Sequence, residues 1–243
     1  MTGSPLLLVE ARLGPGVRGG FTLARPDLDG PAHNLSLTVG DPLGVPARRA
    51  ALEAWLGAPV AYARQVHGRQ VFVCRQVPAQ TPEADALVTT GSATAVAVLV
   101  ADCVPVLLAD AEAGVVAAVH AGRQGVVAGV VPAAVAAMLE LGARAGRLRA
   151  VVGPAVCGAC YEVPGALQQE VVEAVPAAMS TTSWGTPALD LPGAVQAQLA
   201  AAGVSVEATG ACTLEDPRWF SHRAGSARVV GRFAAAVRAL PPD

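Results

Sequence analysis

The chain has 243 residues, of which 53% are hydrophobic and 15% are charged, enough to bury the core of one large domain or two small ones. Its formal net charge is −2 and its 17 cationic residues are all arginine, so the composition gives no basic footprint for nucleic acid. The longest apolar region, residues 93–119, is interrupted by Asp102, Asp110 and Glu112, which argues against a membrane span.

The N-terminal segment and the cysteines both favour a cytoplasmic protein. Residues 1–13 have no cationic start and only a short apolar run, so we expect no signal peptide. Five cysteines are an odd number in a chain of this size, which fits reduced thiols better than a disulfide framework. We find no internal repeat and no linker, so one domain is the simplest account.

The first part of the chain is predicted to form short strands around one helix. Strands are expected over residues 6–10, 19–22, 85–90 and 95–100. Helical spacing over 46–56 predicts a helix that ends at Gly57, and a loop is expected over 27–34. Alternation over 60–73 predicts a strand, a tight turn at His67 and a second strand. His67 could equally be a turn histidine that faces water.

The centre of the chain carries the clearest chemical signal. Two runs rich in valine and leucine, 104–109 and 115–119, flank a polar turn and predict a hairpin of buried strands. Cys103 precedes the first run and His120 follows the second, so the hairpin brings them together, and the Ala-Gly after His120 leaves room for close backbone approach. The pair could be a metal half-site, or a nucleophile and its base. A space-filling thiol and a core histidine are the structural alternative. Asp102 favours function, because a carboxylate among apolar residues needs a partner.

The second part of the chain is predicted to alternate helices and strands. Helices are expected over 125–141, 165–175, 188–202 and 233–240, a loop over 176–187, and strands at 151–154 and 204–208. Pro132 would kink the first of these helices or start a new one. The Cys157-Gly-Ala-Cys160 motif invites a zinc or redox interpretation. Because there is no second such motif and no thioredoxin-like order around this one, we predict a tight turn of small residues instead.

Five motifs follow one another along the chain: QVHG with His67, ADC ending at Cys103, HAG starting at His120, GP and CYEV within 153–163, and CT, FSHR and GR within 212–232. Together they resemble the laccase-domain family, also called multicopper-polyphenol-oxidoreductase-like or peptidoglycan-editing-factor proteins. The resemblance covers nearly the whole chain. It implies an α/β (α+β) fold: a single-domain layered sandwich over residues 1–243 with a mixed β-sheet, as in laccase-domain and cysteine-hydrolase-like folds.

The resemblance also implies a metal and an activity. Family members hold zinc with two histidines and one cysteine, which here are His67, Cys103 and His120, and the last two would also be catalytic. Three protein ligands leave a fourth position for water or substrate, as catalytic zinc requires. The implied reactions are phosphorolysis of adenosine, inosine and S-methyl-5′-thioadenosine, and deamination of adenosine. The expected partners are therefore a small-molecule nucleoside and phosphate, with the chain as a monomer or homodimer.

Further polar residues are candidates for contacts in such a site. Phosphorolysis needs cationic donors, and an arginine fork suits phosphate oxygens, so the candidates are Arg64, Arg223 and Arg232. Any of them could instead be a surface arginine. Asn34 begins a polar stretch that could line the site, and Asp102 could have a catalytic role by orienting a metal ligand.

The chain departs from the family pattern at two places. Family members usually carry Gly-Trp-Arg-Gly after the second histidine, whereas Arg123 and Gln124 replace the Trp-Arg pair here. The usual Ser-Tyr-Arg is Ser-His-Arg here, which makes His222 an additional titratable group near the site. We expect these changes to affect the substrate range more than the metal.

Three other functions compete with the purine nucleoside enzyme. Four histidines are too few for a true multicopper oxidase, although copper bound incidentally at the His-Cys-His site could oxidise phenols weakly. A hydrolase (amidase) acting on peptidoglycan precursors could use zinc, or Cys103 as nucleophile with His120 as base. A non-catalytic protein would use zinc for stability alone, in which case Cys103→Ala would unfold the chain.

Overall fold

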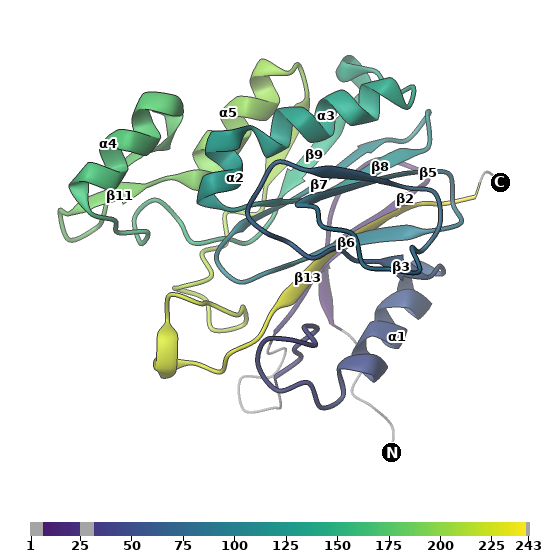
Figure 1. Cartoon of the computed structure of the whole chain (residues 1–243), viewed down its shortest axis with the longest axis horizontal. Coiled ribbons are helices and arrows are strands. Elements are labelled where there is room, and N and C mark those ends of the chain that lie inside the picture. The colour runs from purple at the N-terminus through teal and green to yellow at the C-terminus, as the bar shows by residue number, and fades with distance from the viewer. Residues whose placement is uncertain (1–6, 25–31, 242–243) are drawn as a thin grey trace.

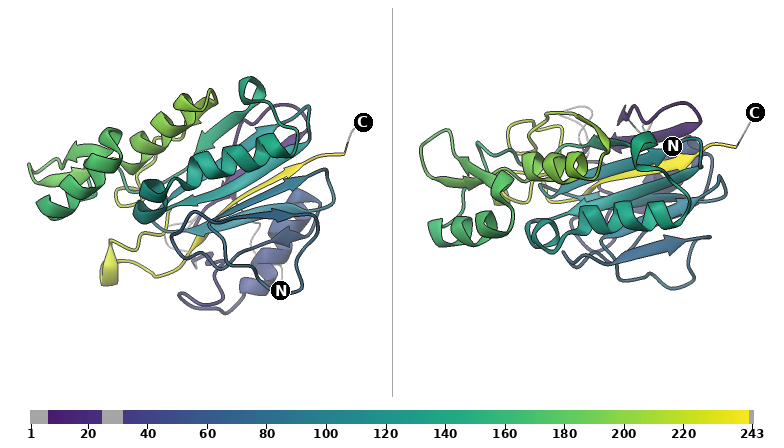
Figure 2. Two further views of the ribbon diagram at one scale, coloured as in Figure 1. Left: turned by 45° about the horizontal axis from the view of Figure 1, so that its top comes forward. Right: turned by 90° about the horizontal axis from the view of Figure 1, so that it is seen from above.

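A computed structural model describes residues 7–24 and 32–241 of the chain. Figures 1 and 2 show two β-sheets packed face to face, with helices on their outer faces. The larger sheet is covered by α2 (Arg123–Ala128), α3 (Val130–Glu140) and α5 (Leu191–Ala201), and the smaller sheet by α1 (Val45–Leu56). The layers are therefore helix, sheet, sheet and helix, which confirms the predicted mixed α/β sandwich.

The smaller sheet has the strand order β1–β2–β13–β6–β3. Its strands are β1 (Leu8–Glu10), β2 (Val17–Thr22), β13 (Phe233–Ala239), β6 (Ala95–Val100) and β3 (Val60–Ala61). Neighbouring strands are antiparallel except β3, which runs parallel to β6. This sheet therefore joins the two ends of the chain to its middle.

The larger sheet has the strand order β12–β9–β7–β8–β5–β4. Its strands are β12 (Ser205–Ala208), β9 (Arg149–Val152), β7 (Val104–Asp110), β8 (Val115–Ala121), β5 (Ala86–Thr90) and β4 (Val71–Cys74). The outer pairs β12/β9 and β4/β5 are parallel and the inner pairs antiparallel. The predicted central hairpin is confirmed, because β7 and β8 pair along their length and every residue of both is buried.

A small extension lies at one end of the larger sheet, at the left of Figure 1. It contains α4 (Gly165–Ala174) and a hairpin of β10 (Met179–Thr181) and β11 (Pro187–Leu189). The loop predicted over 176–187 therefore holds β10 and the turn of a hairpin, while residues 188–189, predicted as the start of a helix, belong to β11. A 2.8 Å hydrogen bond between the hydroxyls of Thr182 and Thr186 closes the turn. Single 3₁₀ turns occur at Ala145–Arg147, Pro176–Ala178 and Gly225–Ala227.

The predicted final helix over 233–240 is wrong, because this segment is β13, the central strand of the smaller sheet. Alanine favours helices locally, but pairing with β2 and β6 on both sides overrides that preference. Ala235 faces the layer between the sheets and Ala236 faces α1, and both are completely buried. Small side chains are therefore used here to pack a strand closely between two layers.

Two other predictions need adjustment. Residues 60–73 do not form a hairpin, because β3 and β4 belong to different sheets and the chain between them crosses from one sheet to the other. The helix predicted over 125–141 is two helices, α2 and α3, separated by Gly129 with φ +83°. Pro132 lies in the first turn of α3, so it helps to start a new helix.

The remaining expected elements are present with small shifts of boundary, and Gly57 ends α1 in a left-handed conformation. Leu6 and residues 27–31, which belong to a predicted strand and loop, lie outside the described residues. In the described part of the chain, no helix combines the length and apolar character needed to cross a membrane.

Candidate metal centre and its pocket

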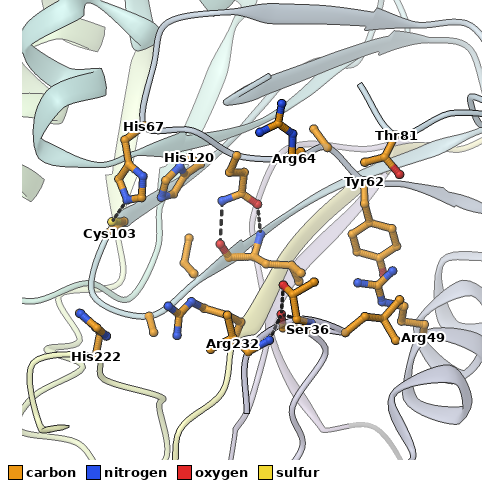
Figure 3. Close-up of a pocket in the computed structure, with 18 residues that line it drawn as sticks. Ser36, Arg49, Tyr62, Arg64, His67, Thr81, Cys103, His120, His222 and Arg232 are labelled. Atoms are coloured by element: carbon orange, nitrogen blue, oxygen red, sulfur yellow. Dashed lines mark hydrogen bonds between the residues drawn. The ribbon is translucent and has the colours of Figure 1, made fainter. Parts of the chain in front are cut away.

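The three residues predicted to bind metal lie together in space although they come from distant parts of the sequence. His67 lies between β3 and β4, Cys103 in the bend between β6 and β7, and His120 in β8 opposite Pro105. Their ligand atoms all lie within 4.8 Å of one another, with Cys103 Sγ 3.7 Å from His67 Nε2. Figure 3 shows the three side chains at one end of a pocket. The set is a compact tripod of two imidazoles and one thiol.

Asp85, which the sequence reasoning did not single out, organises this tripod. Its carboxylate is completely buried just before β5 and accepts a 2.7 Å hydrogen bond from Nδ1 of His120. It also accepts hydrogen bonds from the backbone N–H groups of Val66, His67 and Gly68, at 3.2, 2.9 and 2.7 Å. Because Nδ1 of His120 donates to Asp85, Nε2 is left as the atom that can bind a metal. One carboxylate thus sets the position of His67 and the tautomer of His120.

Gly122 allows the tripod to close. A Cβ atom at this position would lie 2.5 Å from Cδ2 of His67 and 3.3 Å from Sγ of Cys103. Three residues later, a Cβ at Gly125 would lie 2.9 Å from the carbonyl oxygen of Gly68. The start of α2 therefore packs directly against the segment that carries His67, as the Ala-Gly sequence after His120 predicted.

The electrostatics of the tripod favour a thiolate. Burial raises the pKa of the Cys103 thiol, but hydrogen bonding and charge from His120 and His67 outweigh burial and lower it to about 6. Burial lowers the pKa of His120, but Asp85 and Cys103 outweigh burial and raise it to about 9. A thiolate is the form of cysteine that binds metals, and a set of two imidazoles and one thiolate fits zinc. The residues present therefore suit zinc, the metal that the family resemblance implies.

The carboxylate of Asp102 bonds to residues outside the tripod, whereas we expected it to orient a metal ligand. It adopts φ +81°, and its carboxylate accepts 2.6 Å hydrogen bonds from the hydroxyl of Thr213 and the backbone N–H of Arg223. Asp102 thus ties the bend that carries Cys103 to the C-terminal part of the chain. The structure shows no hydrogen bond between Asp102 and a residue of the tripod within the described ranges.

The tripod lies in the wall of a cavity of about 580 Å³. The other lining residues come from β6, from α1 and from loops far apart in sequence: Ser36–Val39, Arg49, Tyr62–Gln65, Thr81, Leu99–Ala101, His222 and Arg232. The side-chain amide of Gln65 exchanges two 2.8 Å hydrogen bonds with the backbone of Leu99, which fixes one wall. At the opposite end, the Arg49 guanidinium stacks 4.0 Å from the ring centre of Tyr62.

The predicted substrate-binding residues divide into two groups. Arg64 and Arg232 line the cavity, and the exposed Arg64 is paired with Glu83. Arg223 and Asn34 are not among the lining residues: the Arg223 guanidinium lies 4.7 Å from the ring centre of Tyr161.

Asn34 is buried and holds the loop that forms one cavity wall. Its amide nitrogen donates to the carbonyl groups of Ser36, Val39 and Asp41, and its amide oxygen accepts from the backbone N–H groups of Ser36 and Arg232. Any effect of Asn34 on a substrate therefore passes through this loop and through Arg232.

The departures from the family pattern fall at different distances from the cavity. Arg123 and Gln124 lie in the first turn of α2 and are not among the lining residues. His222 does line the cavity, so this substitution places an imidazole where it can face a ligand.

The fold and the tripod together define a layered α/β protein with a three-residue metal-type site in the wall of a pocket. Residues 27–239 match the model of a family described as multi-copper polyphenol oxidoreductase laccase, and the chain belongs to this family. The resemblance drawn from the motifs is therefore confirmed.

Several relatives and solved structures are similar over most of their length. A Streptomyces griseus protein named purine nucleoside phosphorylase ORF3 is 52% identical over 212 residues, covering 84% of this chain and 85% of its own. A Deinococcus radiodurans protein named purine nucleoside phosphorylase is 41% identical over 216 residues, covering 84% and 81%. The crystal structure of the Neisseria meningitidis protein NMB0706 has a TM-score of 0.81 at 30% identity and covers 98% of this chain and 100% of its own.

Proposed function

We propose that this chain is a zinc-dependent purine nucleoside enzyme. Its reactions would be phosphorolysis of adenosine, inosine and S-methyl-5′-thioadenosine to the free base and (methylthio)ribose 1-phosphate, together with deamination of adenosine. The observation that carries the proposal is the pocket in which the His67–Cys103–His120 tripod opens toward an arginine-bearing wall. The names of the relatives support the same class of substrate.

The residues of the tripod would hold the metal. Zinc bound there would supply Lewis-acid chemistry, which polarises an oxygen atom of water or of a substrate. Asp85 contributes by keeping Nδ1 of His120 protonated and by fixing the backbone around His67. Gly122 contributes by letting His67 approach Cys103. The chain's own part is thus to present three donors in a fixed arrangement.

Arg232 is the better placed of the candidates for binding phosphate. It lines the cavity, and burial lowers its pKa while the charges of Cys103 and Asp102 raise it, yet a guanidinium stays cationic at neutral pH. Arg64 also lines the cavity, but its pairing with Glu83 at the surface competes with an anion.

In phosphorolysis a phosphate oxygen bonds to C1′ while the bond from C1′ to the base nitrogen breaks, and the base leaves with the electron pair and takes up a proton.

Tyr62 offers a further contact for a nucleoside. Its hydroxyl is buried in the wall of the cavity and has no hydrogen-bond partner among the described residues. Because an unpaired buried hydroxyl is costly, a polar atom of a ligand would satisfy it. A ribose hydroxyl or a ring nitrogen of the base has the required chemistry.

The test is incubation of the zinc-loaded protein with adenosine, with and without phosphate, and separation of the products by chromatography. Adenine and ribose 1-phosphate should form only with phosphate, whereas inosine should form in both cases. His120→Ala should abolish all three products. Arg232→Ala should raise the KM for phosphate and leave deamination nearly unchanged, with the exposed Arg12→Ala as the matched control. A zinc-loaded, folded protein that turns over none of these nucleosides would rule the proposal out.

A second candidate, a hydrolase (amidase) acting on peptidoglycan precursors, is favoured by one feature of the site. Cys103, His120 and Asp85 are arranged as a nucleophile, its base and the group that orients the base. A zinc-bound thiolate is not a free nucleophile, so chelation of the metal separates the two functions. Chelation should abolish nucleoside turnover, whereas a cysteine hydrolase would keep or gain activity.

A further inference from the structure

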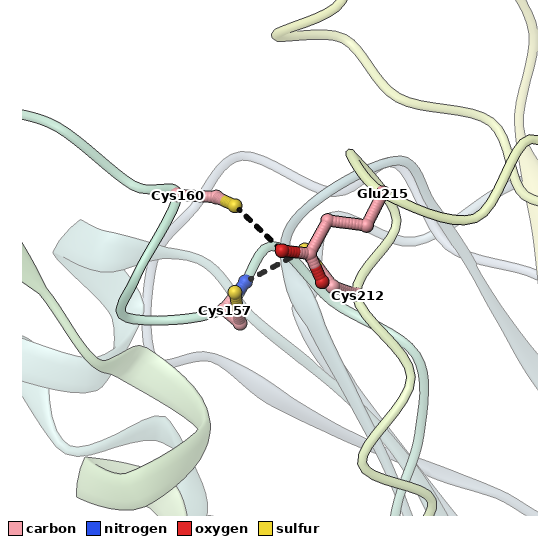
Figure 4. Close-up of side chains that lie close together, drawn as sticks. All are labelled: Cys157, Cys160, Cys212 and Glu215. Atoms are coloured by element: carbon pink, nitrogen blue, oxygen red, sulfur yellow. Dashed lines mark hydrogen bonds between the residues drawn. The ribbon is translucent and has the colours of Figure 1, made fainter. Parts of the chain in front are cut away.

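The second group of metal-type ligands in the described residues lies outside the pocket. Cys157 and Cys160 lie on the turn after β9, and Cys212 and Glu215 lie on a turn near the C-terminal end of the fold. Their ligand atoms all lie within 4.8 Å of one another. Figure 4 shows side chains from the two turns facing each other, with the Glu215 carboxylate 3.4 Å from Sγ of Cys160.

The backbone holds the two turns together independently of these side chains. Ala155 and Cys212 form a parallel bridge, in which Ala155 N donates to Ala211 O at 3.2 Å and Thr213 N donates to Ala155 O at 3.0 Å. The backbone N–H of Cys157 points at Sγ of Cys212, 3.4 Å away. The third sulfur atom is therefore brought to the Cys-x-x-Cys turn by the fold, 55 residues after Cys157.

The donor set has the chemistry of a closed zinc site. Three thiolates and a carboxylate are accepted zinc ligands, and two cysteines separated by two residues on a tight turn are the usual half of such a site. With Zn–S bonds of about 2.3 Å, tetrahedral ligands lie roughly 3.8 Å apart, so the group needs only a small contraction. Cys160 and Cys212 are buried, which fits a site that is shut off from substrate.

Zinc binds cysteine as the thiolate, so metal binding at this group would release the protons of its thiols to solvent.

We propose that Cys157, Cys160, Cys212 and Glu215 form a second, structural zinc site, separate from the His67–Cys103–His120 tripod. The site would fasten the turn after β9 to the C-terminal segment. Thr213 is next to Cys212 and donates to Asp102, and Val156 N, next to Cys157, donates to Asp102 O at 3.0 Å. The second zinc would therefore brace the bend that positions Cys103.

The first experiment counts zinc per chain by elemental analysis of protein purified with zinc under reducing conditions. The wild type should hold two zinc ions. Cys160→Ser and Cys212→Ser should each hold one, and the matched control Cys74→Ser, at a buried thiol that belongs to neither group, should hold two. One zinc per chain in the wild type, unchanged by Cys160→Ser, would overturn the proposal. His120→Ala reports separately on the tripod: if it keeps two ions while Cys212→Ser loses one, the tripod assignment fails and the second site stands.

A second measurement does not depend on whether the cysteine variants fold. Cobalt loaded into His120→Ala should give the intense near-ultraviolet bands of several cobalt–thiolate bonds, which a site without sulfur ligands cannot give. Glu215→Gln, an exposed substitution that keeps all three sulfur atoms, should still bind zinc but release it to a chelator about tenfold faster. An intact mass 2 Da lower without metal, with three reactive thiols instead of five, would show a disulfide in the group and overturn the proposal.

Discussion

At the scale of single residues, some groups of the candidate site could be recognised in the sequence and others could not. Cys103 and His120 could be found because both flank apolar runs that predict paired strands. Asp85 was missed, although it carries the same signal as Asp102, a carboxylate beside a buried strand. The third cysteine of the second group could not be found, because nothing in the sequence shows that residues 155 and 212 are neighbours.

Asp85→Asn should weaken zinc binding by about 10–100-fold, because the buried carboxylate that orients His120 and His67 becomes a neutral amide. Competition with a coloured zinc chelator would measure the affinity, and circular dichroism would establish that the fold is kept. Glu83→Gln is the matched control, since this nearby acidic residue is exposed and pairs only with Arg64 among the contacts described. Unchanged affinity in Asp85→Asn would show that this carboxylate does not support the metal.

Gly122→Ala should lower kcat on the order of 100-fold, because the new Cβ would lie 2.5 Å from Cδ2 of His67 and must displace it. Gly146→Ala is the control, since a Cβ there meets nothing within 4 Å. The measurement is steady-state turnover of the zinc-loaded variants with the nucleoside that the wild type prefers. Equal kcat values for the two variants would contradict the close packing of His67 on Gly122.

At the scale of elements, prediction succeeds where local pattern and tertiary position agree. The run Val115–Val119 is apolar and β-branched, and it becomes a strand buried on both faces. The segment Phe233–Ala239 is rich in alanine, which favours a helix, and only its position between β2 and β6 makes it a strand. The two strands predicted on either side of His67 are present as β3 and β4, but the sequence does not reveal that they join different sheets.

Ala235→Leu tests the close packing of β13. Ala235 is fully buried between the sheets and pairs with Phe21 on one side and Val98 on the other. The larger side chain should lower the free energy of unfolding by about 1–3 kcal/mol through overpacking. Urea denaturation would measure the change, with Ala200→Leu on the exposed face of α5 as the control expected to stay within about 0.5 kcal/mol. Equal stability in both variants would show that the layer has room to spare.

At the scale of the whole molecule, several buried carboxylates make the fold sensitive to acid. Asp110 is completely buried at the end of β7. It accepts hydrogen bonds from the backbone N–H groups of Ala113 and Arg144 and from the guanidinium of Arg147. Burial raises its pKa, but these partners outweigh burial, so the pKa of Asp110 is lower in the folded chain than in the unfolded chain. The pKa values of Asp85 and Asp216 are also lowered in the folded chain.

A lowered carboxyl pKa means that the unfolded chain binds the proton more tightly than the folded chain. The contribution of Asp110 to stability is therefore complete above an unfolded pKa of about 3.9 and is lost as the pH falls through the lower folded value. Asp110→Asn should lower the free energy of unfolding by about 2 kcal/mol at pH 7, and the two proteins should approach equal stability below pH about 4. Urea denaturation between pH 7 and pH 3 would show whether the curves converge. Glu112→Gln is the control, because Glu112 also pairs with Arg147 but its side chain is 73% exposed, so its curve should follow that of the wild type. Curves for wild type and Asp110→Asn that stay parallel would mean that the carboxylate of Asp110 titrates alike in the folded and unfolded chains.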